Sequence, residues 1–276
     1  MFDNPTDQYR DGYDPLFLGE DFRIDLPKLS REMEEDSTRM DNGSNVLDYV
    51  HFSIVMCQSR GLAYFTAVNI DGTCFQGSKR GTDRWALDSR IKRSAQYGNK
   101  VYVGNKLDRG HLVRRLDPVW GDEEIARQAD ADTFYYTNCA PQHKDLNQKT
   151  WLDLEGYILD NALAHKLKIS VFTGPVLNEN FIEYREIYKI PVEFWKVVAM
   201  IKEEDRSLSV TAYLQSQDAY MGDLEFAYGE YKTYQVPIAT IEERTGLDFG
   251  NAYEFNPVED SESSGFVITE PKDIRL

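Results

Sequence analysis

YVGNKLDRGHLVRR, residues 102–115, is the stretch that decides which fold to expect for this chain. Within it, Arg109 offers a permanently charged guanidinium, which can bind a phosphate through two hydrogen bonds. Two residues later, His111 offers an imidazole with an ordinary pKa of about 6.5, so that it is largely neutral and can accept a proton at neutral pH. An arginine and a histidine this close together indicate chemistry on a phosphate group.

A second informative stretch, TFYYTNCAPQHKDLNQKTWLDLE, covers residues 133–155. Its Asn147 and Glu155 offer oxygen ligands that suit Mg²⁺, a cation that keeps most of its waters and needs only one or two protein oxygens. On a helix, eight residues separate these side chains by about 12 Å along the axis and about 80° around it. At this separation the two side chains are not expected to touch the same small ion. We therefore expect Asn147 to bind the metal directly and Glu155 to hold it through a water molecule.

Two further stretches occur in the same order, HFSIVMCQSRGLAYFTAVNIDG at 51–72 and ISVFTGPVL at 169–177. Together the four segments resemble the DNA/RNA non-specific endonucleases of the ββα-metal superfamily, which include mitochondrial endonuclease G and secreted bacterial sugar-non-specific nucleases. The resemblance extends over residues 45 to 250. It implies an α+β fold, with a central and mainly antiparallel sheet flanked by helices.

The same resemblance implies a reaction and a set of site residues. Members of the family hydrolyse phosphodiester bonds of DNA and RNA to 5′-phosphate and 3′-hydroxyl ends, with one Mg²⁺, or Mn²⁺ in its place, and a histidine as general base. The residues that match catalytic positions are His111, Arg109, Glu155, Asn138 and Arg60. The candidate phosphate ligands are Arg109, Arg60, Arg114 and Arg115, and the candidate site-shaping residues are Asp108, Asn138 and Gln142.

One position departs from the family pattern. Many relatives have an arginine four residues after the helix glutamate, where this chain has Leu159. Either Arg114, Arg115 or Arg185 replaces that charge, or the chain cuts more slowly. The other histidines carry less weight: His51 and His165 fit structural positions, and His143 lies in a loop from which it could approach the site.

Charge is unevenly distributed along the 276 residues, whose net charge is −16. Residues 1–48 hold 13 acidic and 5 basic side chains, whereas residues 51–115 hold 4 acidic and 12 basic ones. A nucleic acid would therefore meet its complementary charge around the motif. Candidates for a phosphate-tracking surface are Arg80, Arg84, Arg90, Lys92, Arg93, Arg114 and Arg115.

The chain divides into three segments in this interpretation. Residues 1–44 form an acidic N-terminal arm wrapping the core, 45–255 the endonuclease domain and 256–276 a flexible acidic tail. Apolar runs of strand length occupy 49–57, 62–70, 101–103, 133–139, 169–176, 193–201 and 208–215, and 144–168 has a helical stripe of leucines. The first two runs form an expected hairpin through QSRG, and 73–100 is expected to be a long loop with a short helix.

Composition excludes some classes. No apolar run is long enough to span a bilayer, so no membrane partner is expected, and the acidic N-terminus does not resemble a secretory signal. The compartment therefore stays open between the cytoplasm and a processed secreted form. Cys57, Cys74 and Cys139 include no CxxC pair, which argues against a zinc knuckle and favours small buried side chains.

Two alternatives to a free nuclease remain at this stage. One is an inactive nucleic-acid-binding module that keeps the fold, although His111, Asn147 and Glu155 are intact. The other is a nuclease that is the regulated effector part of a larger protein, with the acidic flanks competing for the basic groove. Beyond DNA and RNA, candidate partners are a second copy of the chain, since relatives are often homodimers, and an inhibitor or regulatory domain.

Overall fold

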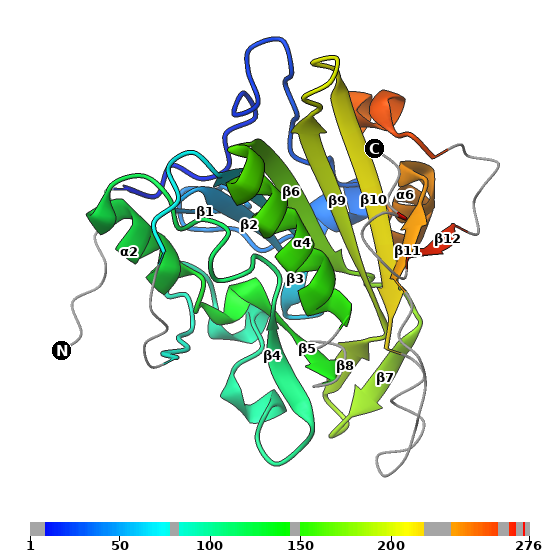
Figure 1. Ribbon diagram of the computed structural model, residues 1–276. Helices are drawn as coiled ribbons and strands as arrows, with labels where there is room; N and C mark the ends of the chain where they lie inside the picture. Colours follow the sequence, from blue (N-terminus) through cyan, green and yellow to red (C-terminus); the bar gives the residue numbers. More distant parts are fainter. Residues whose placement is uncertain are drawn as a thin grey trace.

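The computed structural model describes residues 9–77, 83–143, 150–217, 233–258, 265–268 and 273. In this part of the chain an eight-stranded antiparallel sheet has the order β1-β2-β3-β6-β9-β10-β11-β12 (Figure 1). Its strands are β1 Val46–Tyr49, β2 Phe52–Cys57, β3 Leu62–Asp71, β6 Lys168–Pro175, β9 Glu193–Ile201, β10 Leu208–Ser216, β11 Thr233–Val236 and β12 Phe266–Ile268.

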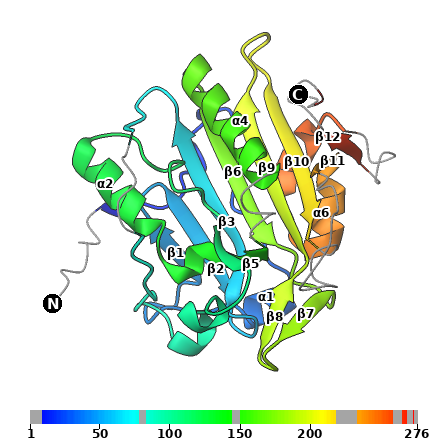
Figure 2. The same cartoon turned by 60° about the horizontal axis from the view of Figure 1, so that its bottom comes forward.

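Two small sheets of two strands each and several helices surround this large sheet. The small sheets pair β4 Leu107–His111 with β5 Cys139–His143, and β7 Phe181–Tyr184 with β8 Tyr188–Pro191. The α-helices are α1 Arg31–Glu35, α2 Glu123–Asp132, α4 Thr150–His165 and α6 Ile238–Thr245, and the 3-10 helices are η2 Arg93–Ala95, η3 Asn99–Val101, η4 Tyr136–Asn138 and η5 Gly250–Phe255. Figures 1 and 2 both show α4 lying across one face of the sheet, over β6 and β9. The expected α+β fold with a mainly antiparallel sheet is confirmed.

The sheet separates two apolar cores, because side chains alternate between its faces. Along β9, Phe194 and Val198 belong to the core under α4, with Ile158 and Leu159 of the helix. Trp195 and Val197 belong to the core on the other face, which α6 covers through Ile238 and Ile241. Helix α4 approaches the sheet very closely at the end of β3, where a Cβ on Gly72 would lie 1.9 Å from the Ala162 carbonyl oxygen.

Several expected strands are confirmed. Those predicted at 62–70, 193–201 and 208–215 are present as β3, β9 and β10, the run at 169–176 is β6, and QSRG joins β2 to β3. The strand expected over 49–57 is confirmed from Phe52 to Cys57 as β2, but it begins later than predicted, because the chain turns between Tyr49 and Phe52. His51 lies in this turn with φ of +65°, a left-handed conformation that a continuous strand does not contain.

The strands expected beside the motif are wrong. Val101 ends a 3-10 helix, a turn follows it, and the segment 136–138 forms the 3-10 helix η4. The paired strands lie later in each segment, so that β4 contains the DRGH motif itself. Apolar runs indicated the wrong residues because β4 is polar and is held by main-chain pairing and by the aromatic side chains beneath it.

The N-terminal residues pack closely against the domain. Tyr13 and Ile24 are buried in the core opposite α4, and the Tyr13 hydroxyl donates to the Ile24 carbonyl oxygen at 2.9 Å. Arg10 donates to both carboxylate oxygens of the fully buried Asp132, at 3.0 and 2.8 Å. In the segment expected to be a flexible tail, Phe266–Ile268 pair with β11, so these three residues belong to the sheet.

A search of the described residues finds no helix with the length and hydropathy needed to cross a membrane.

Candidate active site

The DRGH motif lies on β4 of the two-stranded β4–β5 sheet, in which His111 pairs with Cys139 and Arg109 with Pro141. Alternate residues of a strand point to the same face, so the guanidinium of Arg109 and the imidazole of His111 emerge side by side. Gly110 points to the opposite face, where the amide of Gln142 covers it. A Cβ at residue 110 would lie 1.9 Å from Oε1 of Gln142, so any side chain at this position would displace the amide of Gln142.

Aromatic rings surround the Arg109 guanidinium. Its central carbon lies 5.2 Å from the ring centre of Tyr102 and 6.0 Å from those of Trp85 and Tyr136. The Asn99 side chain accepts a hydrogen bond from the same guanidinium. Cations are attracted to aromatic faces at these distances, so within the part of the chain that the structure describes Arg109 is held by rings and an amide and by no acidic side chain.

The His111 ring lies against two aromatic side chains of the same cluster. Ring centres are 4.8 Å apart for His111 and Trp85, and 5.3 Å apart for His111 and Phe134. Trp85 therefore lies against both Arg109 and His111, and it comes from the polar segment 73–100. Its signal in the sequence was a tryptophan within an otherwise hydrophilic loop.

Asn138 is buried completely and binds the main chain immediately after the motif. Its Nδ2 donates to the carbonyl oxygens of Val113 and Thr133 at 2.9 and 3.0 Å, and its Oδ1 accepts from the Val113 amide at 2.8 Å. These bonds fix the chain that leaves His111. The geometry supports a holding role for Asn138 and not contact with the reacting atoms.

Glu155 of α4 lies next to two cations. Lys196 on β9 places its Nζ 3.4 Å from Glu155 Oε1, and the Arg114 guanidinium donates to the Glu155 carbonyl oxygen at 2.9 Å. The carboxyl of Asp117 is buried nearby. Burial is the main cause that raises the pKa of Asp117 to about 7, and the negative charge of Glu155 adds to it. Sequence analysis missed Lys196 and Asp117, although the lysine interrupts an apolar strand.

Leu159, at the position where relatives have an arginine, is 3% exposed and belongs to the core between α4 and the sheet. Of the three arginines considered as replacements, Arg114 reaches Glu155. Arg185 donates to the carbonyl oxygens of Lys100 and Val103 instead.

Arg115, a candidate phosphate ligand, pairs with Asp130 of α2 at 2.9 Å. Because this acid already binds the guanidinium, we leave Arg115 out of the phosphate surface. Arg90 of the same proposed surface is held by Asp88, with 2.7 Å between Nη2 and Oδ2, and by the Asp48 carbonyl oxygen. Both arginines stabilise the fold in these positions.

Arg60, at the β2–β3 turn, is 8% exposed and has two side-chain nitrogens, Nε and Nη2, that are buried without a hydrogen-bond partner. Its Nη1 donates to the Asn178 carbonyl oxygen at 3.1 Å, and its guanidinium lies 4.9 Å from the Phe181 ring centre. Lys189 approaches the same ring at 4.4 Å. A buried guanidinium with unsatisfied donors is costly unless a ligand supplies the acceptors.

The remaining predicted residues fall into two groups. Asp108 pairs with Gln142 across β4 and β5. The exposed basic residues of the proposed surface are Arg84, Lys92 and Arg93. Asn147, the expected metal ligand, and Arg80 lie outside the described residues.

The other histidines and the cysteines have structural surroundings. The His51 ring stacks on Trp120, with ring centres 3.3 Å apart, and burial lowers its pKa. His165 pairs with Glu203 at 3.2 Å, and His143 occupies the last position of β5. Cys57 and Cys139 are buried as expected, whereas Cys74 is exposed, which corrects the expectation for that residue.

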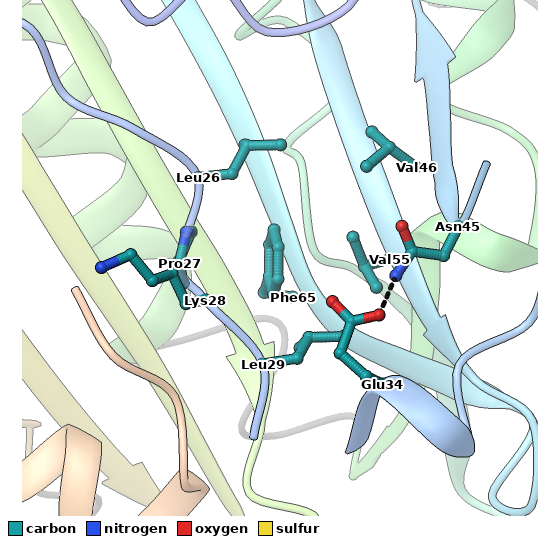
Figure 3. Close-up of a pocket in the computed structure, with 9 residues that line it drawn as sticks. All are labelled: Leu26, Pro27, Lys28, Leu29, Glu34, Asn45, Val46, Val55 and Phe65. Carbon is teal, nitrogen blue, oxygen red and sulfur yellow. Dashed lines mark hydrogen bonds between the residues drawn. The ribbon is translucent and has the colours of Figure 1, made fainter. Parts of the chain in front are cut away.

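A surface hollow of about 330 Å³ lies away from the motif (Figure 3). Val55 and Phe65 form its floor, and both belong to the core on the face of the sheet opposite α4. Glu34 and Asn45 face each other at one side and share a hydrogen bond of 3.1 Å. None of the residues that line the hollow belongs to β4 or β5.

Comparison with known proteins defines first a fold class and then a family. A crystal structure of the EndoG/EndoGI complex superposes with a TM-score of 0.59 at 18% identity, covering 77% of this chain and 90% of that one, which shows the fold of a ββα-metal nuclease. Residues 29–255 match the DNA/RNA non-specific endonuclease family, and the chain belongs to it.

Individual relatives agree with this assignment. The chain is 40% identical over 263 residues to the uncharacterized protein y4fB of Sinorhizobium fredii, a match that covers 88% of the chain and 39% of y4fB. It is 28% identical over 184 residues to mitochondrial endonuclease G of Homo sapiens, covering 63% and 58% of the two chains. Against a nuclease of Serratia marcescens the identity is 27%, with 60% of each chain covered. The chain thus spans between about two fifths and three fifths of these relatives.

Proposed function

We propose that this chain is a metal-dependent endonuclease that hydrolyses phosphodiester bonds of both DNA and RNA. The observation that carries the proposal is the arrangement of Arg109 and His111, which alternate on β4, share one face and both contact Trp85. A fixed cation and a proton acceptor at this spacing match the two needs of phosphodiester hydrolysis, charge neutralisation and activation of water.

In this proposal His111 accepts the proton of the attacking water, because a neutral imidazole is a suitable base near pH 7. Arg109 binds an oxygen of the scissile phosphate and neutralises the charge that accumulates there. Asn138 and Gln142 act indirectly, since the first holds the chain after His111 and the second packs on Gly110. No step needs a 2′-hydroxyl, so DNA and RNA should both be cut, to 5′-phosphate and 3′-hydroxyl ends.

The donor set fits Mg²⁺, with Mn²⁺ as a substitute. Among the described residues, no cluster of three or more His, Cys, Asp or Glu side chains could form a metal cage. An oxygen site with one or two protein ligands, as Mg²⁺ prefers, needs no such cluster. Asn147 would bind the ion directly and Glu155 would hold it through a water molecule. When bound, the ion would supply positive charge at the phosphate and the leaving oxygen.

Arg60 extends the proposed phosphate-binding surface beyond the β4–β5 sheet. Its two unsatisfied buried nitrogens and the neighbouring Lys189, both against Phe181, provide charge that a nucleic-acid phosphate can satisfy. We assign Arg114 to a different task, because its guanidinium is bound to the Glu155 main chain. Substitution of Arg60 by Met should therefore raise the KM for long DNA more than it lowers kcat.

The deciding experiment is cleavage of a supercoiled plasmid and of a matched single-stranded RNA, each with Mg²⁺ and with EDTA. Metal-dependent cutting of both supports the proposal. Binding without cutting would instead identify an inactive nucleic-acid-binding module, and cutting of only one substrate would contradict sugar non-specificity. End-group analysis of the products checks for 5′-phosphates.

A second candidate is a nuclease that works as the effector part of a longer protein. The match to y4fB favours it, because the chain corresponds to only 39% of that relative. The related structure is of an EndoG/EndoGI complex and concerns the mechanism of EndoG inhibition, which favours a protein inhibitor as one partner. A second copy of the chain is another candidate partner, and sedimentation of the purified chain tests it.

A further inference from the structure

Lys196 is an unusual residue for its position. It occupies the middle of β9, between β6 and β10, and only 1% of it is exposed. Strand alternation turns it towards α4, together with Phe194 and Val198. Burial of an ammonium group costs several kcal/mol or more unless hydrogen bonds and an opposite charge offset it. A lysine here therefore needs specific partners.

The structure supplies two such partners, one from the sheet and one from the helix. On the sheet side, Nζ donates to Oγ1 of Thr173, which faces Lys196 directly on β6, at 2.8 Å. On the helix side, Nζ lies 3.4 Å from Oε1 of Glu155. The lysine thus connects a fixed point of the central sheet to the carboxylate on α4.

Stability alone does not explain this ion pair. An apolar side chain of similar length would fit among Phe194, Val198 and the helix and would avoid the desolvation of two charges, a replacement that is often neutral or stabilising. Glu155 is also held at its other end, since Arg114 donates to its carbonyl oxygen. Two cations from different segments therefore restrain one glutamate, in both main chain and side chain.

We propose that Lys196 is a positioning residue for Glu155, whose carboxylate it holds in the orientation that serves the metal site. The inference rests on the proposed function, because Glu155 must act on a metal through water for its orientation to matter. Thr173 is the anchor in this arrangement: it fixes the ammonium group, and the ammonium group fixes the carboxylate. Groups that orient metal-site ligands typically contribute about 10- to 100-fold to metal affinity or activity.

The test is Lys196→Met, which keeps length and apolar volume and removes the charge. Mn²⁺ binding is measured by the electron paramagnetic resonance of free Mn²⁺, and plasmid cleavage at saturating Mn²⁺ gives kcat and KM. We expect Mn²⁺ affinity and kcat to fall by about 10- to 100-fold, with the KM for DNA unchanged. If Lys196 only repelled the metal by its positive charge, Lys196→Met would bind Mn²⁺ more tightly at an unchanged kcat. This result would overturn the inference.

Near-ultraviolet circular dichroism shows whether Lys196→Met folds. A second pair of variants tests the inference if it does not. Thr173→Val removes the anchor, and Thr66→Val removes a buried hydroxyl one strand away whose hydrogen bond, to the Thr173 carbonyl oxygen, does not involve Lys196. If Lys196→Met does not fold, Thr173→Val must lower Mn²⁺ affinity and kcat relative to Thr66→Val. Equal values for the two valine variants would refute the inference.

Glu155→Gln separates this inference from the proposed function. If the unmodified chain shows no metal-dependent cleavage, the proposed function fails. If it cleaves and Glu155→Gln cleaves equally fast, the role of Glu155 at the metal fails, and this inference fails with it. If Glu155→Gln is impaired and a folded Lys196→Met is not, only the role of Lys196 fails.

Discussion

The two faces of the large sheet bury different kinds of side chain along the same strand. On β9, Trp195 and Val197 enter an apolar core that α6 and the N-terminal residues complete. Between them Lys196 points to the other face, towards Glu155 of α4. Along β9 the face opposite α4 thus buries apolar side chains, whereas the face under α4 combines apolar core residues with a buried ion pair.

The difference extends to the neighbouring carboxyl and hydroxyl groups. The α4 side contains Asp117 and Glu155, both less than 10% exposed, and the Thr173 hydroxyl that binds Lys196. The largest side chains opposite, including Trp195 and Phe172, make ring contacts with Phe249. Substitutions of apolar residues on either side should therefore change stability, and substitutions of the charged residues under α4 should change activity or the pH dependence of stability.

The largest effect on activity is expected at His111. Its replacement by Ala removes the general base, which is worth about 10²- to 10⁴-fold in rate, and should leave the melting temperature and DNA binding close to their original values. Initial rates of plasmid nicking measure the loss. His165→Ala, which removes a surface imidazole paired with Glu203, is the matched control. Wild-type rates in His111→Ala would refute the assignment.

Leu159→Arg tests whether a residue of the apolar part of the α4 face tolerates charge. If residue 159 were exposed, an arginine would restore the family pattern and speed cleavage. Because Leu159 is buried in the core, we expect instead a loss of about 3–5 kcal/mol of unfolding free energy, the cost of an uncompensated buried charge. Urea denaturation measures it. Leu159→Met, which conserves volume, should cost less than about 1.5 kcal/mol. Faster cleavage by a stable arginine variant would contradict this placement.

The raised pKa of Asp117, under α4, should make the free energy of unfolding depend on pH. Its folded pKa of about 7 exceeds the ordinary value of 3.8, so between these values the folded state binds more protons than the unfolded state. Stability from this group is therefore complete below pH 3.8 and is lost as pH rises through 7. Asp117→Asn should gain stability relative to the unmodified chain from pH 5 to 7, by at most about 1.4 kcal/mol per pH unit. A constant difference across that range would show that Asp117 titrates normally.

The smallest effect concerns charge on the N-terminal residues. The middle of the chain should bind DNA less tightly as salt rises, whereas repulsion by the acidic arm is screened over about 10 Å at 0.1 M salt. Cleavage should therefore pass through a maximum at moderate salt. Because Tyr13 and Ile24 are buried, deletion of the arm would disturb the core. Neutralisation of the exposed Glu20, Asp21 and Glu32 to amides should instead shift the maximum to lower salt. Identical salt curves would exclude the arm from the substrate path.

Sequence patterns predicted the strands of the large sheet well because long apolar runs such as 62–70 and 193–201 are buried on both faces. They failed at the motif, where β4 is polar and its strand geometry depends on pairing with β5. The leucine stripe correctly indicated a helix, but only the packed structure shows that Leu159 is buried with the core.

For the site, the motif identified Arg109 and His111, and the structure places them on one face as alternation requires. Lys196 could not be recognised in the same way, because its partners Thr173 and Glu155 lie 23 and 41 residues away in sequence, and only the pairing of β6 with β9 and the docking of α4 bring them together. Arg115 shows the reverse case, a basic residue beside the motif whose charge is bound by Asp130.

Two tryptophan–histidine contacts give the protein an optical readout of its own. Trp85 touches His111 in the site, and Trp120 stacks on His51 in the fold. A protonated imidazole quenches indole fluorescence, so Trp85 and Trp120 each report the charge of one histidine. The chain has two further tryptophans, Trp151 and Trp195. With these two and Trp120 changed to Phe, the emission of Trp85 would follow the protonation of the proposed catalytic base in the resting protein, without substrate and without turnover.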